Sequence, residues 1–159
     1  MPTQEDNDLY ISDILDNFID EAYEGILRGD DGINTPVCPC ILQTTDLRSI
    51  SHGSRKPMPE FVSPFLNKTD EEIRDWMLKH PYPGFAEGTF TVLDQQTIDS
   101  GLSRIGYCGE KSPDPRMLIS DPYADLIVRA SVEMCESDWE EEVAEADGVR
   151  TRKEIEQGF

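Results

Sequence analysis

Apolar and acidic residues alternate in the N-terminal region with the period of an α-helix. Apolar side chains recur at spacings of three and four from Ile11 to Ile26, and acidic residues fill the opposite side. This pattern predicts an amphipathic helix over residues 8–28 whose acids lie along an exposed face. Asp8 and Ser12 are alternative caps for its first turn.

Short runs of β-branched and aromatic residues further along the chain predict strands. These runs cover residues 37–44, 89–93, 102–108 and 116–120. Pro39 cannot donate a ladder hydrogen bond, so the first strand is expected at a sheet edge or as an irregular entry to the sheet. The intervening residues 94–101 are rich in turn formers and are expected to join two strands of a hairpin.

Residues 45–68 show no sustained period and are predicted to form a long loop, which is either functional or contains a short helix. Four apolar residues are expected to anchor it: Phe61, Val62, Phe65 and Leu66. The spacing of Thr69 and Glu72 is that of a capping box and predicts a short helix directly afterwards. The inner stripe of that helix consists of Ile73, Trp76 and Met77.

The residues after Asp121 fit two alternatives. Asp121 followed by proline is typical of a helix start, whereas residues 126–130 have the composition of a strand. We favour a strand over 124–130 and a helix from Val132 to about Ala146, with a continuous helix as the main alternative. The tail over 148–159 is expected to fray or to form a short extra helix.

Two runs in the second half of the chain resemble a family of uncharacterised fungal and bacterial proteins. They are GTFTVLDQQTIDSG (88–101) and LIVRASVEMCESDWEEE (126–142). In that family a strand ending in Leu-Asp precedes a variable hairpin, and an Arg-containing strand leads into a closing helix with a Trp. The resemblance supports the strand-then-helix interpretation of 124–146, and it implies no function because the family has no assigned activity.

Together these elements predict one domain over residues 1–159, with residues 1–7 expected to fray. The predicted class is α+β or α/β. We expect a small mixed sheet of about four to five strands, flanked by an N-terminal and a C-terminal acidic helix.

The two ends of the chain are acidic, and the middle is close to neutral. The net charge is −9 over residues 1–31, −2 over 32–120 and −8 over 121–159, which gives −19 for the whole chain. This charge disfavours nucleic acids and anionic membranes, because phosphate groups would be repelled. It favours a basic partner surface or cations.

The N-terminal residues contain no pattern of a secretory leader, since residues 1–8 are polar and acidic. The longest strongly apolar run, over 126–128, is far too short to cross a membrane. We therefore expect an intracellular protein, located in the cytoplasm, with reduced thiols.

The sequence carries few signals of chemistry. The spacing of the four cysteines, Cys38, Cys40, Cys108 and Cys135, lacks the two close pairs of a structural zinc site. Neither His52 nor His80 lies in a recognised catalytic signature, and the chain contains no phosphate-binding glycine loop. We therefore predict no metal, no cofactor and no catalytic residue.

The leading hypothesis is a non-enzymatic protein that presents acidic helix faces to a basic partner surface. The predicted contacts are Asp13, Asp16, Asp20, Glu24, Glu136, Glu140 and Glu141. One alternative is a small enzyme with a site near the 45–68 loop that uses His52 or Cys108, and another is a structural or regulatory subunit.

A basic patch in the 45–68 loop has two interpretations. It could bind the chain's own acidic faces or an anionic ligand, and we favour the first because it needs nothing outside the chain. The patch consists of Arg48, His52, Arg55 and Lys56.

Overall fold

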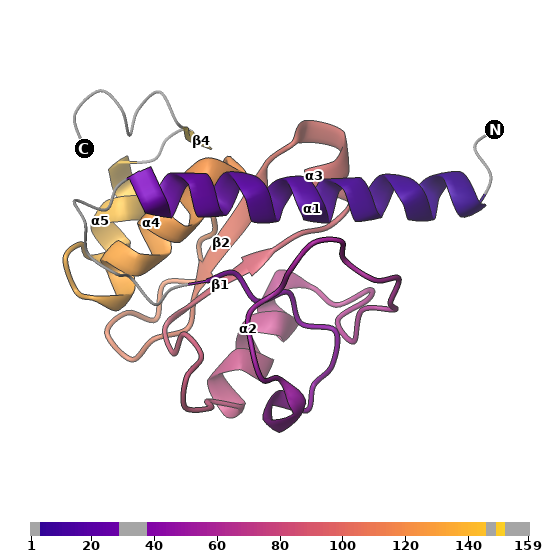
Figure 1. Ribbon diagram of the computed structural model, residues 1–159. Helices are drawn as coiled ribbons and strands as arrows, with labels where there is room; N and C mark the ends of the chain where they lie inside the picture. The colour runs from indigo at the N-terminus through magenta and orange to yellow at the C-terminus, as the bar shows by residue number, and fades with distance from the viewer. Residues whose placement is uncertain (1–3, 29–37, 146–148, 152–159) are drawn as a thin grey trace.

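The computed structural model describes residues 4–28, 38–145 and 149–151, which combine helices with a β-sheet (Figure 1). The helices are α1 (Gln4–Arg28), the 3-10 helix η1 (Leu47–Ser49), α2 (Asp70–Lys79), α3 (Gln95–Ser100), α4 (Pro122–Glu133) and α5 (Trp139–Glu145). The strands are β1 (Thr89–Val92), β2 (Ser103–Tyr107), β3 (Leu118–Ser120) and β4 (Val149–Arg150).

The sheet is built from three antiparallel strands in the order β1-β2-β3. Thr89 pairs with Tyr107, and Ile105 pairs with Leu118. β4 adds a two-residue parallel pairing to β3 at the edge. The prediction of mixed α and β structure is confirmed, but the sheet falls short of four to five full strands.

The segment predicted as the first strand is a loop over residues 38–44, and Val37 lies outside the described residues. Pro39 has no N–H, and its carbonyl accepts a hydrogen bond from Ser54 N at 2.9 Å. The N–H of Ile41 donates to Ser54 Oγ at 2.7 Å. A neighbouring loop thus satisfies the backbone groups that a strand partner would otherwise bind.

Residues 124–130 are helical, so the predicted strand is wrong. Asp121 Oδ1 accepts a hydrogen bond from Ala124 N at 2.9 Å, and Pro122 occupies the first turn. This cap starts α4, which ends at Glu133. The predicted helix over 132–146 is consequently interrupted, and only its second part forms α5.

Two further elements differ from the prediction. α1 begins at Gln4, so Asp8 and Ser12 lie inside the helix and are not its caps. The predicted turn over 94–101 contains α3, which Asp94 caps by accepting a hydrogen bond from Gln96 N. Gly101 ends α3 in the left-handed conformation with φ 76°, where glycine carries no steric penalty.

The main core lies between one face of the sheet and helices α4 and α5. It contains Ile105, Tyr107, Leu118, Val128, Val132, Trp139 and Val143. α1 packs on α4 through Phe18, Ala22 and Leu126, and Figure 1 shows α1 running across the molecule with α4 behind its C-terminal part. α2 covers the opposite face of the sheet, where Ile73 and Met77 pack against Phe90, Val92 and Cys108.

The predicted capping box of α2 is confirmed. Glu72 N donates to Thr69 Oγ1, and Thr69 N donates to Glu72 Oε2. The 45–68 segment is a loop with one 3-10 turn, as expected, but its buried anchor is Met58. Val62 and Leu66 are 79% and 62% exposed, so they do not pin the loop to the core.

A row of polar side chains on α4 faces β1. Asp125 is fully buried and accepts a hydrogen bond from Thr91 Oγ1 at 2.6 Å. Arg129 donates to Thr91 Oγ1 at 3.3 Å and to Thr89 O at 3.1 Å. Glu133 accepts from the backbone N–H of Thr89 at 2.7 Å. This row fixes α4 on β1, because each polar group finds its partner in only one register.

Candidate interaction site

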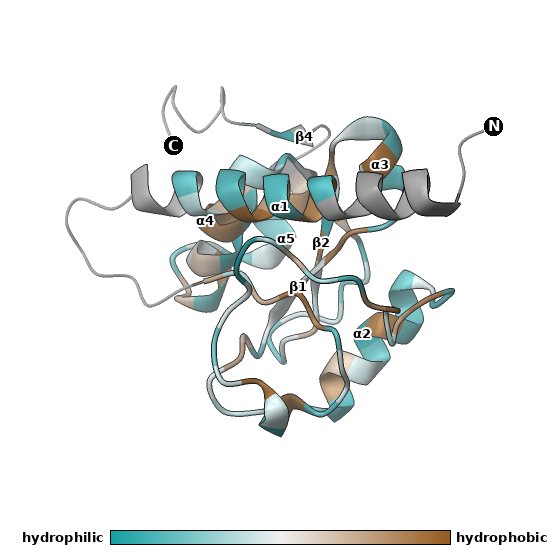
Figure 2. Cartoon of the chain, turned by 45° about the vertical axis from the view of Figure 1, so that its right-hand side comes forward, coloured by the Kyte–Doolittle hydropathy of each residue, from teal (hydrophilic) through white to brown (hydrophobic). Residues whose placement is uncertain are grey.

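The exposed side of α1 carries a line of mostly acidic residues. The spacing of these residues places them on one helix face, opposite the buried Leu15 and Ile19. Figure 2 shows hydrophilic residues recurring along the outer side of α1 and hydrophobic ones where it lies over α4. We call this line the α1 ridge, and it comprises Asp13, Asn17, Asp20 and Glu24.

Two predicted contact residues of α1 also bind the chain itself. Asp16 is half-buried, and its Oδ1 accepts a hydrogen bond from Met58 N at 2.9 Å. Asp20 forms an ion pair with Lys56, with Nζ and Oδ2 2.7 Å apart. The basic patch was predicted to pair with the chain's own acids, and the ion pair of Lys56 with Asp20 confirms this for Lys56. Asp16 serves mainly to hold the loop that carries Met58.

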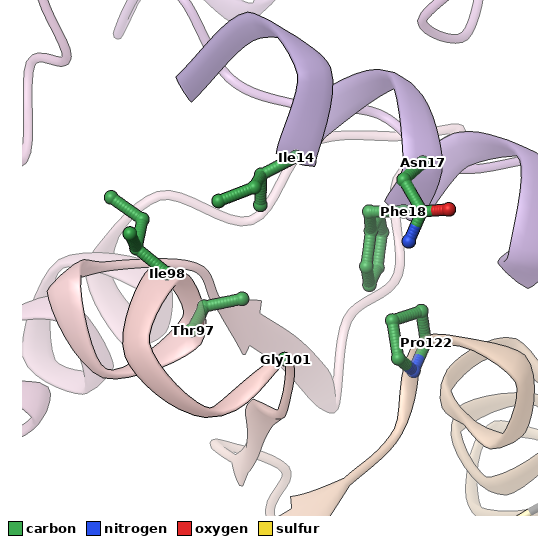
Figure 3. A pocket seen from close by; sticks show the side chains of 7 residues that line it. All are labelled: Ile14, Asn17, Phe18, Thr97, Ile98, Gly101 and Pro122. Carbon is green, nitrogen blue, oxygen red and sulfur yellow. The ribbon is translucent and has the colours of Figure 1, made fainter. Parts of the chain in front are cut away.

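A cleft of about 190 Å³ opens beside the α1 ridge (Figure 3). Three elements form its walls: α1, the region of α3 and the first residue of α4. Figure 3 shows the side chains from α1 and from α3 extending toward the same space. The lining residues are Ile14, Asn17, Phe18, Thr97, Ile98, Gly101 and Pro122.

The cleft is mainly apolar, with polar groups at its margin. Ile14, Phe18 and Ile98 supply hydrocarbon surface, whereas Asn17 presents an amide. Asn17 is exposed and also belongs to the α1 ridge, so the cleft and the ridge are continuous. Thr97 is buried, and its Oγ1 accepts a hydrogen bond from Asp94 N. Such a site suits an apolar group whose neighbours are polar or basic.

The second acidic group lies between α4 and α5 and in the first turn of α5. Glu136 and Glu141 are exposed and line a cavity of about 290 Å³. Glu140 accepts a hydrogen bond from Ser112 Oγ at 2.8 Å, so it has a partner within the fold. The neighbouring Glu142 is buried and forms an ion pair with Arg150 at 2.8 Å.

The residues of the alternative enzyme hypothesis have separate environments. His52 is exposed, and its Nδ1 lies 2.7 Å from Gly53 O. Cys108 is buried, and its Sγ lies 3.5 Å from Glu87 O. Burial raises the pKa of Cys108 to about 11, with the Glu133 carboxylate adding to the effect. A thiol in this state is a poor nucleophile at neutral pH. Within the described ranges, no group of three or more His, Cys, Asp or Glu side chains is placed to hold a metal ion.

Sequence reasoning missed the cleft because its walls come from distant segments. The turn signal before Gly101 and the cap signal at Asp121 and Pro122 were visible, but neither indicates that α1 crosses above them. The acidic face of α1 was predictable because it depends on helical period alone.

Comparison of the chain with protein-family models, curated proteins and solved structures gave no match. In the described part of the chain, every helix is too short or too polar to cross a membrane.

Proposed function

We propose that this protein is a non-enzymatic interaction protein that binds a basic segment of a partner protein through the α1 ridge and the adjoining cleft. One observation carries this proposal: an exposed acidic helix face continues, at Asn17, into an open apolar cleft. The ridge would attract basic side chains, and the cleft would receive an apolar one.

The electrostatic contribution concerns selectivity and association rate. The chain has a net charge of −19, so it attracts basic surfaces at long range and repels acidic ones. Asp13 and Glu24 are exposed carboxylates at the two ends of the α1 ridge. Pairs at an exposed surface contribute little individually, about 0.2–1 kcal/mol each. Charge alone therefore gives weak and unselective binding, and an apolar contact is needed as well.

The cleft has the size of a binding site for a side chain. Its volume of about 190 Å³ is below the roughly 300–1,000 Å³ of small-molecule sites. A single aliphatic side chain fits the apolar walls, and its burial contributes about 1.5–3 kcal/mol. We therefore infer a partner segment in which an apolar residue is flanked by Lys or Arg.

The second acidic group, Glu136, Glu140 and Glu141, is proposed as an auxiliary contact region. It lies in a different part of the fold, and one of its members already accepts a hydrogen bond from Ser112. Its exposed members provide a matched comparison for the α1 ridge, because the same number of charges can be removed at each place.

The test uses two synthetic peptides of equal charge as probes, one of Lys and Leu and one of Lys and Gln. Binding is measured by fluorescence anisotropy at low and high salt. Asp13→Asn/Glu24→Gln is expected to weaken binding of the Lys/Leu peptide about fivefold, at roughly 0.5 kcal/mol per charge. Glu136→Gln/Glu141→Gln, which removes the same charge elsewhere, is expected to have the smaller effect.

Ile14→Gln separates the cleft from the charge. This variant is expected to weaken binding of the Lys/Leu peptide and to leave the Lys/Gln peptide unaffected, because only the former uses the cleft. Circular dichroism checks that each variant keeps its fold. The proposal fails if neither peptide binds at low salt, if binding ignores salt, or if both charge variants weaken binding equally.

A further inference from the structure

Lys111 and Cys135 meet in a different part of the molecule from the α1 ridge. Lys111 lies in the turn after β2, and Cys135 follows the end of α4, 24 positions later. Lys111 Nζ donates a hydrogen bond to Cys135 Sγ at 2.6 Å. Both side chains belong to exposed residues. A nucleophilic sulfur and an amine are thus held in contact where solvent reaches them.

The pair lines a cavity of about 290 Å³. Trp139 lines the same cavity, is 2% exposed, and its buried Nε1 has no hydrogen-bond partner in the described part of the chain. Ser137 also lines the cavity, and its buried Oγ has no hydrogen-bond partner in the described part of the chain either. A cavity of this size beside the pair admits a small polar molecule, whereas these two buried atoms are too enclosed to contact it.

The backbone holds Cys135 in an uncommon conformation. Its φ of 59° is left-handed, a conformation usually taken by glycine or asparagine after a helix. Its N–H donates to Val132 O at 3.1 Å, and Glu136 N donates to Ser131 O at 2.8 Å. These bonds fix the chain where α4 ends and place the thiol in front of Lys111.

We infer that Cys135 is an oxidation site for hydrogen peroxide and that Lys111 captures the oxidised sulfur as a sulfenamide. The Cys135 thiolate attacks one peroxide oxygen and the O–O bond breaks. The leaving hydroxide takes a proton from the Lys111 ammonium, which gives sulfenic acid, water and a neutral amine. The amine then attacks the sulfur, an S–N bond forms, and the hydroxyl group leaves with an amine proton as a second water.

The electrostatics of the pair agree with these roles. The hydrogen bond to Cys135, followed by attraction to its charge, raises the pKa of Lys111. Lys111 is therefore an ammonium at neutral pH and supplies the proton that the leaving hydroxide takes. Cys108 provides the contrast, because it is buried and burial raises its pKa to about 11. Peroxide is expected to spare it.

The test treats the full chain with hydrogen peroxide under non-reducing conditions and measures its mass before and after proteolysis. The expected product is a Lys111–Cys135 linked peptide that lacks two hydrogen atoms and is released by a thiol reductant. Cys135→Ser and Lys111→Met are expected to abolish the link, whereas Cys38→Ser, which removes another exposed thiol, is expected to retain it.

A sulfenic-acid trapping reagent gives a second readout. Trapping at Cys135 should increase several-fold in Lys111→Met, because the intermediate is no longer captured. The inference is overturned if trapping is equal in the unmodified protein and in Lys111→Met. It is also overturned if the linked peptide contains an additional oxygen atom, or if only other cysteines are oxidised. Thermal unfolding of the reduced variants establishes that they are folded before oxidation.

Discussion

Replacement of Arg129 by methionine is expected to lower the free energy of unfolding by about 3 kcal/mol at neutral pH, the scale of a broken buried ion pair. Arg129 Nη1 lies 3.8 Å from Asp125 Oδ1, and Asp125 is fully buried. That oxygen has no hydrogen-bond partner within the described residues. Removal of the guanidinium would therefore leave a buried carboxylate without its compensating charge.

The effect of Arg129→Met is expected to depend on pH. Burial raises the pKa of Asp125, while Arg129 and the hydrogen bond from Thr91 oppose this shift. The folded protein consequently holds the Asp125 proton more tightly than the unfolded chain, whose aspartates titrate near pH 4. Stability from this group is present below pH 4 and is lost as pH rises through the folded pKa. Without Arg129 the pKa of Asp125 in the folded protein rises further. The free energy of unfolding that Arg129→Met loses is therefore larger at higher pH.

Urea denaturation near pH 4 and at pH 7 measures this dependence, with each variant compared with the unmodified protein at the same pH. At the lower pH Asp125 is protonated to a greater extent, so the loss in Arg129→Met comes mainly from the missing hydrogen bonds of Arg129 to Thr89 and Thr91. Asp125→Asn/Arg129→Met should be more stable at pH 7 than Arg129→Met alone. A pH-independent cost, or no recovery in the double variant, would contradict the predicted pairing.

Arg116→Met is the matched control, because the Arg116 side chain is 54% exposed where it pairs with Asp114. Its cost is expected to stay below about 1 kcal/mol, as for other surface ion pairs. The two arginines thus compare the same chemical change in an ion pair with a buried carboxylate, at Arg129, and in an ion pair whose arginine is exposed to solvent, at Arg116.

The sequence was most informative where one element has one buried face. α1 exposes one side to solvent, so its helical period is visible in the sequence from Ile11 to Ile26. The capping box at Thr69 was equally visible because its two hydrogen bonds are local. The strands of the β1–β2 hairpin and a turn-rich connection between them were predicted from composition, although the helix α3 in that connection was not.

α4 was misread because it is buried on several sides. Val128 packs toward the sheet core, and Leu126 packs against α1. Such a helix has a nearly continuous apolar sequence, which periodicity cannot distinguish from a buried strand. The cap at Asp121 was the correct signal for this segment. In the structure it starts a helix despite the β-branched composition of the residues after it. The polar row on α4 was not predicted either, because its partners on β1 are distant in sequence.

Gly25→Ala is expected to destabilise the protein by about 2 kcal/mol, although alanine is the better helix former. Gly25 lies in α1 at its crossing with α4, where an added Cβ would meet Tyr123 O at 1.9 Å. That atom belongs to the backbone, so no change of rotamer relieves the overlap. The gain from helix propensity is only about 1 kcal/mol, whereas overpacking costs roughly 1–3 kcal/mol.

The overlap must be relieved by moving α1 away from α4, which loosens the contact of Phe18 and Ala22 with Leu126. The loss of that apolar contact adds to the steric cost, so the net change is destabilising. Denaturant unfolding measures it, with Asn17→Ala as the control on the exposed face of the same helix. Asn17→Ala should be neutral or slightly stabilising because its side chain is exposed. A stabilised Gly25→Ala variant would show that α1 does not approach α4 this closely, and the cleft that both helices line would then lose its support.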